Sequence, residues 1–166
     1  DARSSHEVDG SHMSEDADRE HVPLPPLVYL AGILAGFGID WLIPVRGLSL
    51  ETQLVVGLPI IVLAIVLVLM SAWELSRAGT SPLHERPTTK VISHGLYGMS
   101  RNPIYVAMTL GCIGVAITAD RVWVLAATVI AVLVIDRMVI AREEVFLEAK
   151  FGDDYLSYKT QVRRWV

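Results

Sequence analysis

The sequence contains few of the residues on which many soluble enzymes depend. Cys112 is the only cysteine among 166 residues, which excludes an internal disulfide framework and any metal site built from several cysteines, so no metal is expected. No glycine-rich loop of the kind that binds dinucleotides after a β-strand is present. Charged residues make up only 19% of the chain and the net charge is −4. A balance so close to neutral gives no sign of a nucleic-acid partner.

The first residues resemble a vector-derived sequence. We expect residues 1–12 to be an expression tag remnant, so His6 and His12 are left out of any catalytic or metal argument. Residues 13–26 are acidic and proline-rich, unlike the basic start of a signal peptide, and are expected to form a cytoplasmic N-terminal segment. The remaining residues, 27–166, are expected to form a single membrane domain.

Apolar residues are plentiful and come in long blocks. They make up 52% of the chain, and the mean hydropathy is +0.47. A helix needs roughly 17 to 25 apolar residues to cross the hydrocarbon core of a bilayer. Four blocks come close to this length, over residues 27–43, 53–73, 103–119 and 122–140. We therefore expect an all-α polytopic membrane protein of about four transmembrane helices, with cytoplasmic C-terminal helices over residues 141–166.

Some residues inside these blocks indicate departures from regular helix packing. Pro59 lies in the second block and is expected to bend it, because proline supplies no backbone N–H. Gly111 and Gly114 allow a neighbouring helix to approach the third block closely. Asp40, near the end of the first block, is expected either at the membrane interface or facing the bundle.

Basic residues are distributed unevenly over the loops. Four lie between the second and third blocks: Arg77, Arg86, Lys90 and Arg101. Six more lie late in the fourth block or after it: Arg137, Arg142, Lys150, Lys159, Arg163 and Arg164. Only Arg46 and Arg121 fall in the other two loops. By the positive-inside rule, both termini and the loop over residues 74–102 are expected on the cytoplasmic side of a bacterial or archaeal inner membrane.

The stretch HGLYGMSRNPIYV, residues 94–106, is a polar cluster at the start of the third block. Asn102 followed by Pro103 predicts a helix N-cap and first turn. Arg101 then lies at the positive end of the helix dipole, where a guanidinium and free backbone N–H groups favour a bound carboxylate or phosphate. Tyr105 is expected to face the same volume. The alternative is that the arginine and the tyrosine only anchor the helix end at the membrane surface.

A second polar cluster follows the fourth block. Residues spaced by three or four favour one helix face, and these are Glu144, Leu147, Phe151, Tyr155 and Tyr158. Gly152, with Asp153 as an N-cap, indicates instead that one helix ends here and another begins. In the alternative interpretation the segment is an amphipathic helix on the membrane surface, with its apolar side chains at the lipid boundary and Glu143 and Glu144 in solvent.

Together these segments resemble the pattern of an integral-membrane methyltransferase family that contains isoprenylcysteine carboxyl methyltransferases and phospholipid N-methyltransferases. The pattern runs His-Gly-x-Tyr, then Arg-His/Asn-Pro-x-Tyr, then Glu-Glu-x-x-Leu-x-x-x-Phe-Gly-x-x-Tyr-x-x-Tyr. The matching residues are His94, Gly95, Tyr97, Arg101, Asn102, Pro103, Tyr105, Glu143, Glu144, Leu147, Phe151, Gly152, Tyr155 and Tyr158. The resemblance covers roughly residues 74–166. It departs at Asn102, where many relatives carry histidine, and in a short tail ending at Val166.

The resemblance implies a methyltransferase that binds S-adenosylmethionine on the cytoplasmic side and releases S-adenosylhomocysteine. The catalytic residues that it implies are Arg101, Glu143 and Glu144. The cofactor-binding residues that it implies are His94, Gly95, Leu96, Tyr97, Arg101, Asn102, Pro103, Tyr105, Glu143, Glu144, Tyr155 and Tyr158. Within this set, Arg101 is expected to hold the methionine carboxylate, and Glu143 or Glu144 the ribose hydroxyls or the ammonium group.

The acceptor implied by the resemblance is a lipophilic molecule that enters from the bilayer, and membrane lipids are the expected partners. An isoprenylcysteine-like carboxylate is the first expectation, and a phospholipid amine is the alternative within the family. Membrane reductases that use a nicotinamide cofactor share the C-terminal architecture but are usually much longer. A non-catalytic small membrane protein is the remaining alternative. Transporters place ionisable groups near the bilayer midplane, whereas the charges here gather at one face, which favours an interfacial enzyme.

Overall fold

The computed structural model describes residues 25–79 and 91–166. The expected tag remnant, with His6 and His12, and most of the segment over residues 13–26 lie outside the described residues. Every regular element in the described ranges is a helix, which confirms the predicted all-α class. In chain order the elements are α2 (Pro25–Leu42), α3 (Leu50–Thr52), the π-helical turn η1 (Gln53–Gly57), α4 (Leu58–Arg77), the 3₁₀ turn η2 (Gly95–Gly98), α5 (Pro103–Thr118), α6 (Val122–Val134), the π-helical turn η3 (Ile135–Ile140), α7 (Ala141–Phe151) and α8 (Asp153–Gln161).

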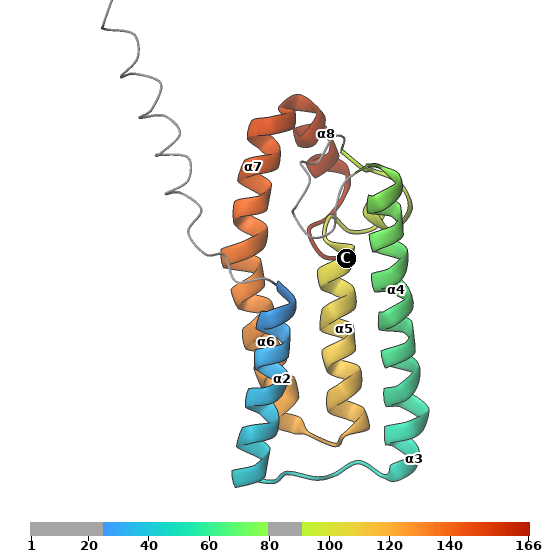
Figure 1. The fold of residues 1–166 in the computed structure, drawn as a ribbon, viewed down its shortest axis with the longest axis vertical. Helices are drawn as coiled ribbons and strands as arrows, with labels where there is room; N and C mark the ends of the chain where they lie inside the picture. The colour runs from blue at the N-terminus through green and yellow to red at the C-terminus, as the bar shows by residue number, and fades with distance from the viewer. Residues whose placement is uncertain (1–24, 80–90) are drawn as a thin grey trace, which may run out of the picture.

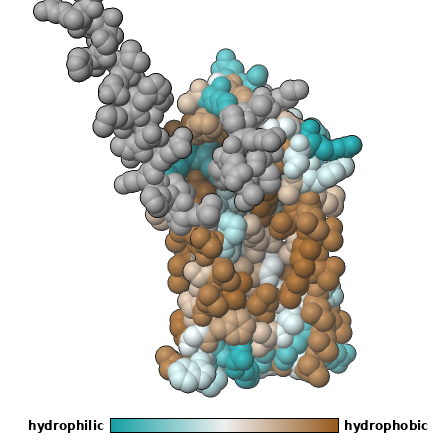
Figure 2. Space-filling model, in the orientation of Figure 1, coloured by the Kyte–Doolittle hydropathy of each residue, from teal (hydrophilic) through white to brown (hydrophobic). Residues whose placement is uncertain are grey.

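Four helical rods stand side by side in the bundle (Figure 1). Three of them are long and apolar enough to cross a membrane, over Pro25–Leu42, Leu50–Arg77 and Val122–Phe151. The fourth, α5, is apolar but has only 16 residues, which corresponds to about 24 Å of helix. On the face shown in Figure 2, a broad hydrophobic band covers the rods, with hydrophilic surface toward both ends. The rods agree with the predicted spans, and α5 is shorter than a typical bilayer core.

Glycines bring neighbouring helices into close contact. A Cβ atom added at Gly114 of α5 would lie 2.7 Å from Ile61 Cγ1 of α4, and one added at Gly36 of α2 would lie 2.6 Å from Val124 Cα of α6. Neither distance leaves room for a carbon atom. A Cβ added at Gly111 would lie at an ordinary 3.5 Å from the nearest side chain. Of the two glycines predicted to matter in α5, Gly114 therefore sets the helix spacing.

The irregularity expected at Pro59 is a π-helical turn. The turn η1 ends two residues before Pro59, which lies in the first turn of α4. Because proline cannot donate to the carbonyl four residues earlier, a wider turn at this point accommodates it. A second π-helical turn, η3, lies between α6 and α7, where Asp136 and Arg137 bring charge into the apolar rod.

A cluster of charges closes the end of the bundle where α2 ends and α6 begins. Asp40 is only 1% exposed and faces the bundle. Arg46 donates to both of its carboxylate oxygens, at 2.7 and 2.8 Å, and Arg121 donates to the same carboxylate. We call Asp40, Arg46 and Arg121 the far-end cluster. Both arginines of these loops therefore serve to neutralise one buried carboxylate.

At the opposite end, the rod of α6 continues through η3 into α7 and extends well beyond α5 (Figure 1). The chain then turns at Gly152, whose φ of 52° is the conformation that favours glycine, and enters α8. The expectation that Asp153 is the N-cap of the last helix is wrong. Gly152 occupies the capping position of both helices, so Asp153 is already the first residue of α8. After α8 the chain returns to the start of α5.

Candidate functional site

The start of α5 and the first turn of α7 meet in one ion pair. Arg101 Nη1 lies 3.1 Å from Glu144 Oε1, and the two side chains are only 9% and 7% exposed. The alternative in which Glu144 faces solvent is wrong, because α7 turns this carboxylate toward the bundle. Arg101 likewise points into the protein and not toward a membrane surface. The two polar segments of the sequence therefore lie together in space.

Arg101 has hydrogen-bonding capacity that the protein leaves unused. Its Nε and Nη1 atoms are buried, and neither has a hydrogen-bond partner among the described residues. The contact with Glu144 is thus an ion pair without hydrogen-bond alignment. Leaving buried donors unpaired costs free energy, so a polar ligand that accepted from them would be bound favourably.

Two further basic residues surround Glu144. Arg164 in the C-terminal tail donates to Glu144 from Nε at 3.0 Å and from Nη2 at 2.7 Å, and Lys159 Nζ of α8 lies 3.7 Å from Glu144 Oε2. We call Arg101, Glu144, Lys159 and Arg164 the near-end cluster. Sequence reasoning counted Lys159 and Arg164 only as cytoplasmic positive charge. No spacing in the sequence relates them to Glu144, so only their basic character could have drawn attention to them.

Asn102 occupies the predicted N-cap position of α5, but its side chain does not cap the helix. Its Nδ2 instead donates to the Arg164 carbonyl at 3.0 Å. The predicted N-cap position is therefore confirmed, while the contact of its side chain is with the returning tail, which the sequence alone does not place here. Pro103 follows as the buried first residue of α5, as predicted.

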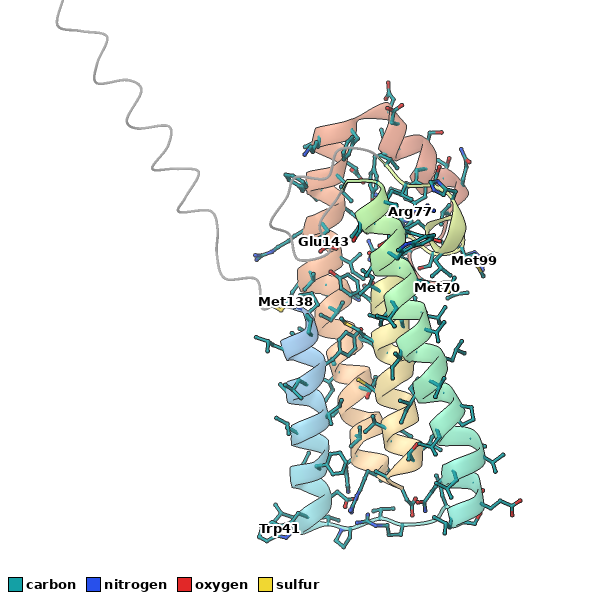
Figure 3. The ribbon with its side chains drawn as sticks, turned by 45° about the vertical axis from the view of Figure 1, so that its right-hand side comes forward. Trp41, Met70, Arg77, Met99, Met138 and Glu143 are labelled. Carbon is teal, nitrogen blue, oxygen red and sulfur yellow. The ribbon has the colours of Figure 1, made fainter. Side chains whose placement is uncertain are left out.

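Glu143 belongs to a second polar group on the neighbouring face of α7. Its Oε1 accepts a hydrogen bond from the Tyr105 hydroxyl at 2.8 Å. Figure 3 places Glu143 at the same end of the bundle as Arg77 and Met99, with Trp41 at the other end. Tyr105 rises from the first turn of α5, so Glu143 and Glu144 contact the two ends of a single short segment of the chain.

The turn η2 explains the His-Gly-x-Tyr motif. Gly95 has a φ of 61°, and a Cβ atom there would overlap the Glu74 carboxylate at the end of α4. That carboxylate accepts the Leu96 N–H at 3.1 Å. Sequence reasoning missed Glu74, because nothing near it in the sequence marks it as the partner of the Leu96 N–H, 22 residues later. His94 is exposed, and the structure does not bring it into the near-end cluster.

Tyr155 and Tyr158 of α8 are buried and pack with Val162. Leu147 and Phe151 of α7 pack against this group. The alternative in which Leu147 and Phe151 lie at the lipid boundary is therefore wrong, because α8 folds back over them. The Tyr158 hydroxyl donates to the Tyr97 carbonyl at 2.6 Å, which ties α8 to η2.

Burial and neighbouring charges shift several ionisations at this end. Burial raises the pKa of Tyr97, and Tyr158, Glu74 and Glu143 raise it further. Burial also raises the pKa of Tyr155, while the Arg101 guanidinium beside it acts in the opposite direction. The hydrogen bond to Glu144 raises the pKa of Arg164, so this guanidinium stays charged. The phenols thus remain neutral donors at physiological pH.

A hollow of about 420 Å³ adjoins this region between α8 and the chain before η2. Its lining residues are Val91, Ser93, Phe151, Asp154, Ser157, Tyr158 and Gln161. Burial raises the pKa of Tyr158, and the positive charge of Arg101 acts in the opposite direction with a smaller effect. The hollow therefore lies next to the near-end cluster. It offers aromatic faces, a carboxylate and hydroxyl or amide groups, none of which the sequence motifs apart from Phe151 and Tyr158 had indicated.

Comparison with known proteins gives a family match that includes most of this region. The profile of a family described as "Phospholipid methyltransferase" matches residues 52–154, more than half of the chain. A protein of Haemophilus influenzae described as "Uncharacterized protein" is 58% identical over 38 residues, which are 23% of this chain and 60% of that protein. The chain therefore spans less than two thirds of that relative's length. No solved structure matches the chain.

Proposed function

The chain belongs to the phospholipid methyltransferase family, and on that premise we propose that it transfers a methyl group from S-adenosylmethionine to a lipid acceptor at the membrane surface. The observation that carries the proposal is the buried contact between Arg101 and Glu144, 3.1 Å apart. It joins two separate family motifs at the end of an apolar belt (Figure 2). That is the place where a water-soluble donor can meet an acceptor dissolved in the bilayer.

The residues at this end fit the donor. Arg101 offers buried N–H groups, which find no hydrogen-bond partner among the described residues, to the carboxylate of the methionine part. In the adjoining hollow, the Asp154 carboxylate suits the ribose hydroxyls and Phe151 offers an aromatic face to the adenine. When bound, S-adenosylmethionine supplies an electrophilic methyl group on a sulfonium. The protein's part is chiefly to hold the reactants in line in a dry volume, an effect that can contribute about 7 to 11 kcal/mol.

The charges near Glu143 favour an amine acceptor over a carboxylate. Glu143 and Glu74 both act electrostatically on Tyr97, so two carboxylates lie around this side of the site. A carboxylate acceptor, the first expectation from the sequence, would be repelled there, whereas an ammonium headgroup would be attracted. We therefore place the phospholipid amine, the sequence-based alternative, ahead of the prenylated carboxylate.

An amine acceptor must lose a proton before its lone pair can attack the methyl group. Glu143 is suited to accept that proton, and the Tyr105 hydroxyl, 2.8 Å from its Oε1, holds the carboxylate in position. The acyl chains of the acceptor would stay in the apolar belt while the headgroup reaches Glu143. By the positive-inside rule, this end of the bundle faces the cytoplasm, from which the donor enters.

A transfer assay with defined acceptors tests the proposal. Purified protein is incubated in lipid nanodiscs with methyl-labelled S-adenosylmethionine, and the nanodiscs contain either phosphatidylethanolamine or an added prenylcysteine. We expect label in the phosphatidylethanolamine product. The variant Arg101→Ala should lose this activity, while Arg137→Ala, which removes a side chain that is 80% exposed, should keep it. Label in the prenylcysteine alone would reverse the acceptor assignment, and no label in any lipid would contradict the proposed function.

A further inference from the structure

The C-terminal tail carries a charged side chain into the centre of the near-end cluster. Arg164 holds both oxygens of Glu144, with Nε at 3.0 Å from Oε1 and Nη2 at 2.7 Å from Oε2. Its remaining Nη1 lies 3.2 Å from Asp136 Oδ1 in the π-helical turn η3. Trp165 donates from Nε1 to the same Asp136 oxygen at 3.0 Å. One guanidinium thus links the carboxylates of two successive segments of the long rod.

The backbone of the tail is fixed to the start of α5. Arg101 donates its N–H to the Arg163 carbonyl at 2.9 Å. The Arg164 carbonyl accepts from Asn102 Nδ2 at 3.0 Å and from Ser100 Oγ at 3.2 Å. The tail therefore spans from α5 to α7, and its contacts lie on either side of Arg101.

These contacts give Arg101 and Glu144 different roles. Arg164 satisfies both Glu144 oxygens in the two-pronged geometry that suits a carboxylate. Glu144 then has little capacity left for a ligand, but it still lies 3.1 Å from Arg101 Nη1. Arg101, by contrast, keeps buried donors without a hydrogen-bond partner among the described residues. The arrangement orients Arg101 and leaves its N–H groups available.

We infer that Arg164 is a positioning residue: it holds Glu144 in place and, through Glu144, aims the Arg101 guanidinium at the donor carboxylate. This inference rests on the proposed function and deepens it. Residue 164 lies beyond the range matched by the family profile, which ends at residue 154. Glu144 becomes a support for Arg101 and not a ligand-binding group, while Glu143 is the carboxylate that faces the acceptor.

The neighbouring Arg163 provides a matched control within the same tail. It is the same residue type, and its backbone carbonyl accepts from Arg101, but its side chain is exposed and forms no ion pair or hydrogen bond with the cluster in the described part of the chain. Arg163→Gln removes one positive charge from the tail and keeps the backbone contact. Arg164→Gln removes the same charge together with the two hydrogen bonds to Glu144. A general effect of tail charge would be the same in both variants.

The test measures binding of S-adenosylhomocysteine to the full chain by isothermal titration. Arg164→Gln should weaken binding at least about tenfold, since charged hydrogen bonds position the binding group. Arg164→Lys should recover part of the loss, because lysine restores the charge but not the planar fork. Arg163→Gln should bind within about twofold of the unaltered protein. In an Arg101→Lys background, adding Arg164→Gln should cause little further loss, because both changes act through one guanidinium.

Two results would overturn the inference: equal affinity in Arg164→Gln and the unaltered protein, or losses that are fully additive with Arg101→Lys. The proposed function fails separately, if the unaltered protein does not bind S-adenosylhomocysteine at all. In that case the thermal unfolding temperatures of Glu144→Gln, Arg164→Gln and the double variant still decide whether the two residues act as a pair. Independent effects on unfolding would contradict the pairing itself.

Discussion

The two ends of the bundle hold the same kind of ion cluster and use it differently. In the far-end cluster the Asp40 carboxylate receives hydrogen bonds from both of its arginines. These arginines lie at the surface, with side chains 43% and 28% exposed. In the near-end cluster Arg164 donates to the Glu144 carboxylate, and Arg101 is buried beside it with two nitrogen atoms that find no hydrogen-bond partner within residues 25–79 and 91–166. The first cluster closes a helix end, and the second keeps a cation ready for a ligand.

The residues around the two clusters also differ in what they contact. The Asp120 carboxylate at the far end accepts the N–H groups of Gly47 and Leu48, so this charge holds a loop in place. At the near end, buried tyrosines and a hollow of about 420 Å³ lie next to the ion pair. A buried charge is therefore not by itself a sign of function. Unused hydrogen-bonding capacity alone does not separate the two clusters either, because Arg121 Nε at the far end is also buried without a hydrogen-bond partner among the described residues. Arg101 differs in being only 9% exposed, with two such nitrogen atoms, and in lying next to a hollow.

Glu143→Gln should produce the largest effect and should act only at the near end. Removing a group that accepts a proton in the transition state typically lowers turnover about 10²-fold or more. The glutamine can still accept the Tyr105 hydroxyl, so this contact should be retained. Turnover with an amine lipid, measured at saturating donor, should fall while S-adenosylhomocysteine affinity stays the same. A loss of donor affinity as large as the loss of turnover would move Glu143 to the donor side of the site.

Asp40→Ala makes the complementary change at the far end. It leaves Arg121 without its buried partner. Breaking a fully buried pair costs about 3 to 5 kcal/mol, and the partial exposure of both arginines reduces our expectation to about 2 kcal/mol. Unfolding in mixed detergent micelles should show this loss of stability, and donor affinity should not change. Weaker donor binding in a protein that is still folded would mean that the two ends are coupled.

Gly95→Ala should disturb the turn η2 without reaching the far end. The substitution places a methyl group on the Glu74 carboxylate and forces a φ of 61° on a non-glycine residue, which together cost about 1 to 2 kcal/mol. Hydrogen exchange at the Leu96 amide, which donates to Glu74, should become faster. Gly98→Ala is the milder control in the same turn: its backbone φ is not positive, and its added Cβ would make a tight contact of 3.2 Å with the Ser93 carbonyl oxygen but would not overlap it. Equal exchange in the two variants would argue against the steric role of Gly95.

Alkaline pH should produce the smallest effect. Burial raises the pKa of Tyr155 above the ordinary value of 10.0, so the folded state keeps a proton that the unfolded state releases. The stability from this group is complete below pH 10.0 and is lost as pH rises through the higher pKa of the folded state. Tyr155→Phe should make the decline of the unfolding temperature above about pH 10 shallower. An unchanged slope would show that Tyr155 is not buried as described.

Much of the fold could be predicted from the sequence, because the bilayer imposes helix lengths that hydropathy reveals. The expected span over residues 27–43 is α2, Pro25–Leu42, and the span expected to begin at residue 122 begins at Val122. The C-terminal ends of the long rods were less predictable. α4 continues to Arg77 and the last rod to Phe151, because charged residues leave the hydrocarbon without ending a helix.

Some residues of the candidate site could be predicted from local sequence motifs, and others could not. Arg101, Glu143 and Glu144 stand in motifs, so a local pattern was sufficient to select them. Glu74 and Arg164 could not be selected, since their roles arise only when α4 ends beside η2 and the tail returns to α5. The same folding back gives the Asn102 side chain, at the predicted N-cap position, a partner in the tail. Contacts between distant segments are set by tertiary packing, which sequence spacing does not record.

Titration of S-adenosylhomocysteine into the purified protein tests the central claim most directly, with Arg101→Ala and Asp40→Ala as paired variants from the two ends. The account predicts that the unaltered protein binds, that Arg101→Ala binds at least about tenfold more weakly, and that Asp40→Ala binds like the unaltered protein. No binding by the unaltered protein in several detergents and lipids, or equal binding by Arg101→Ala, would contradict it.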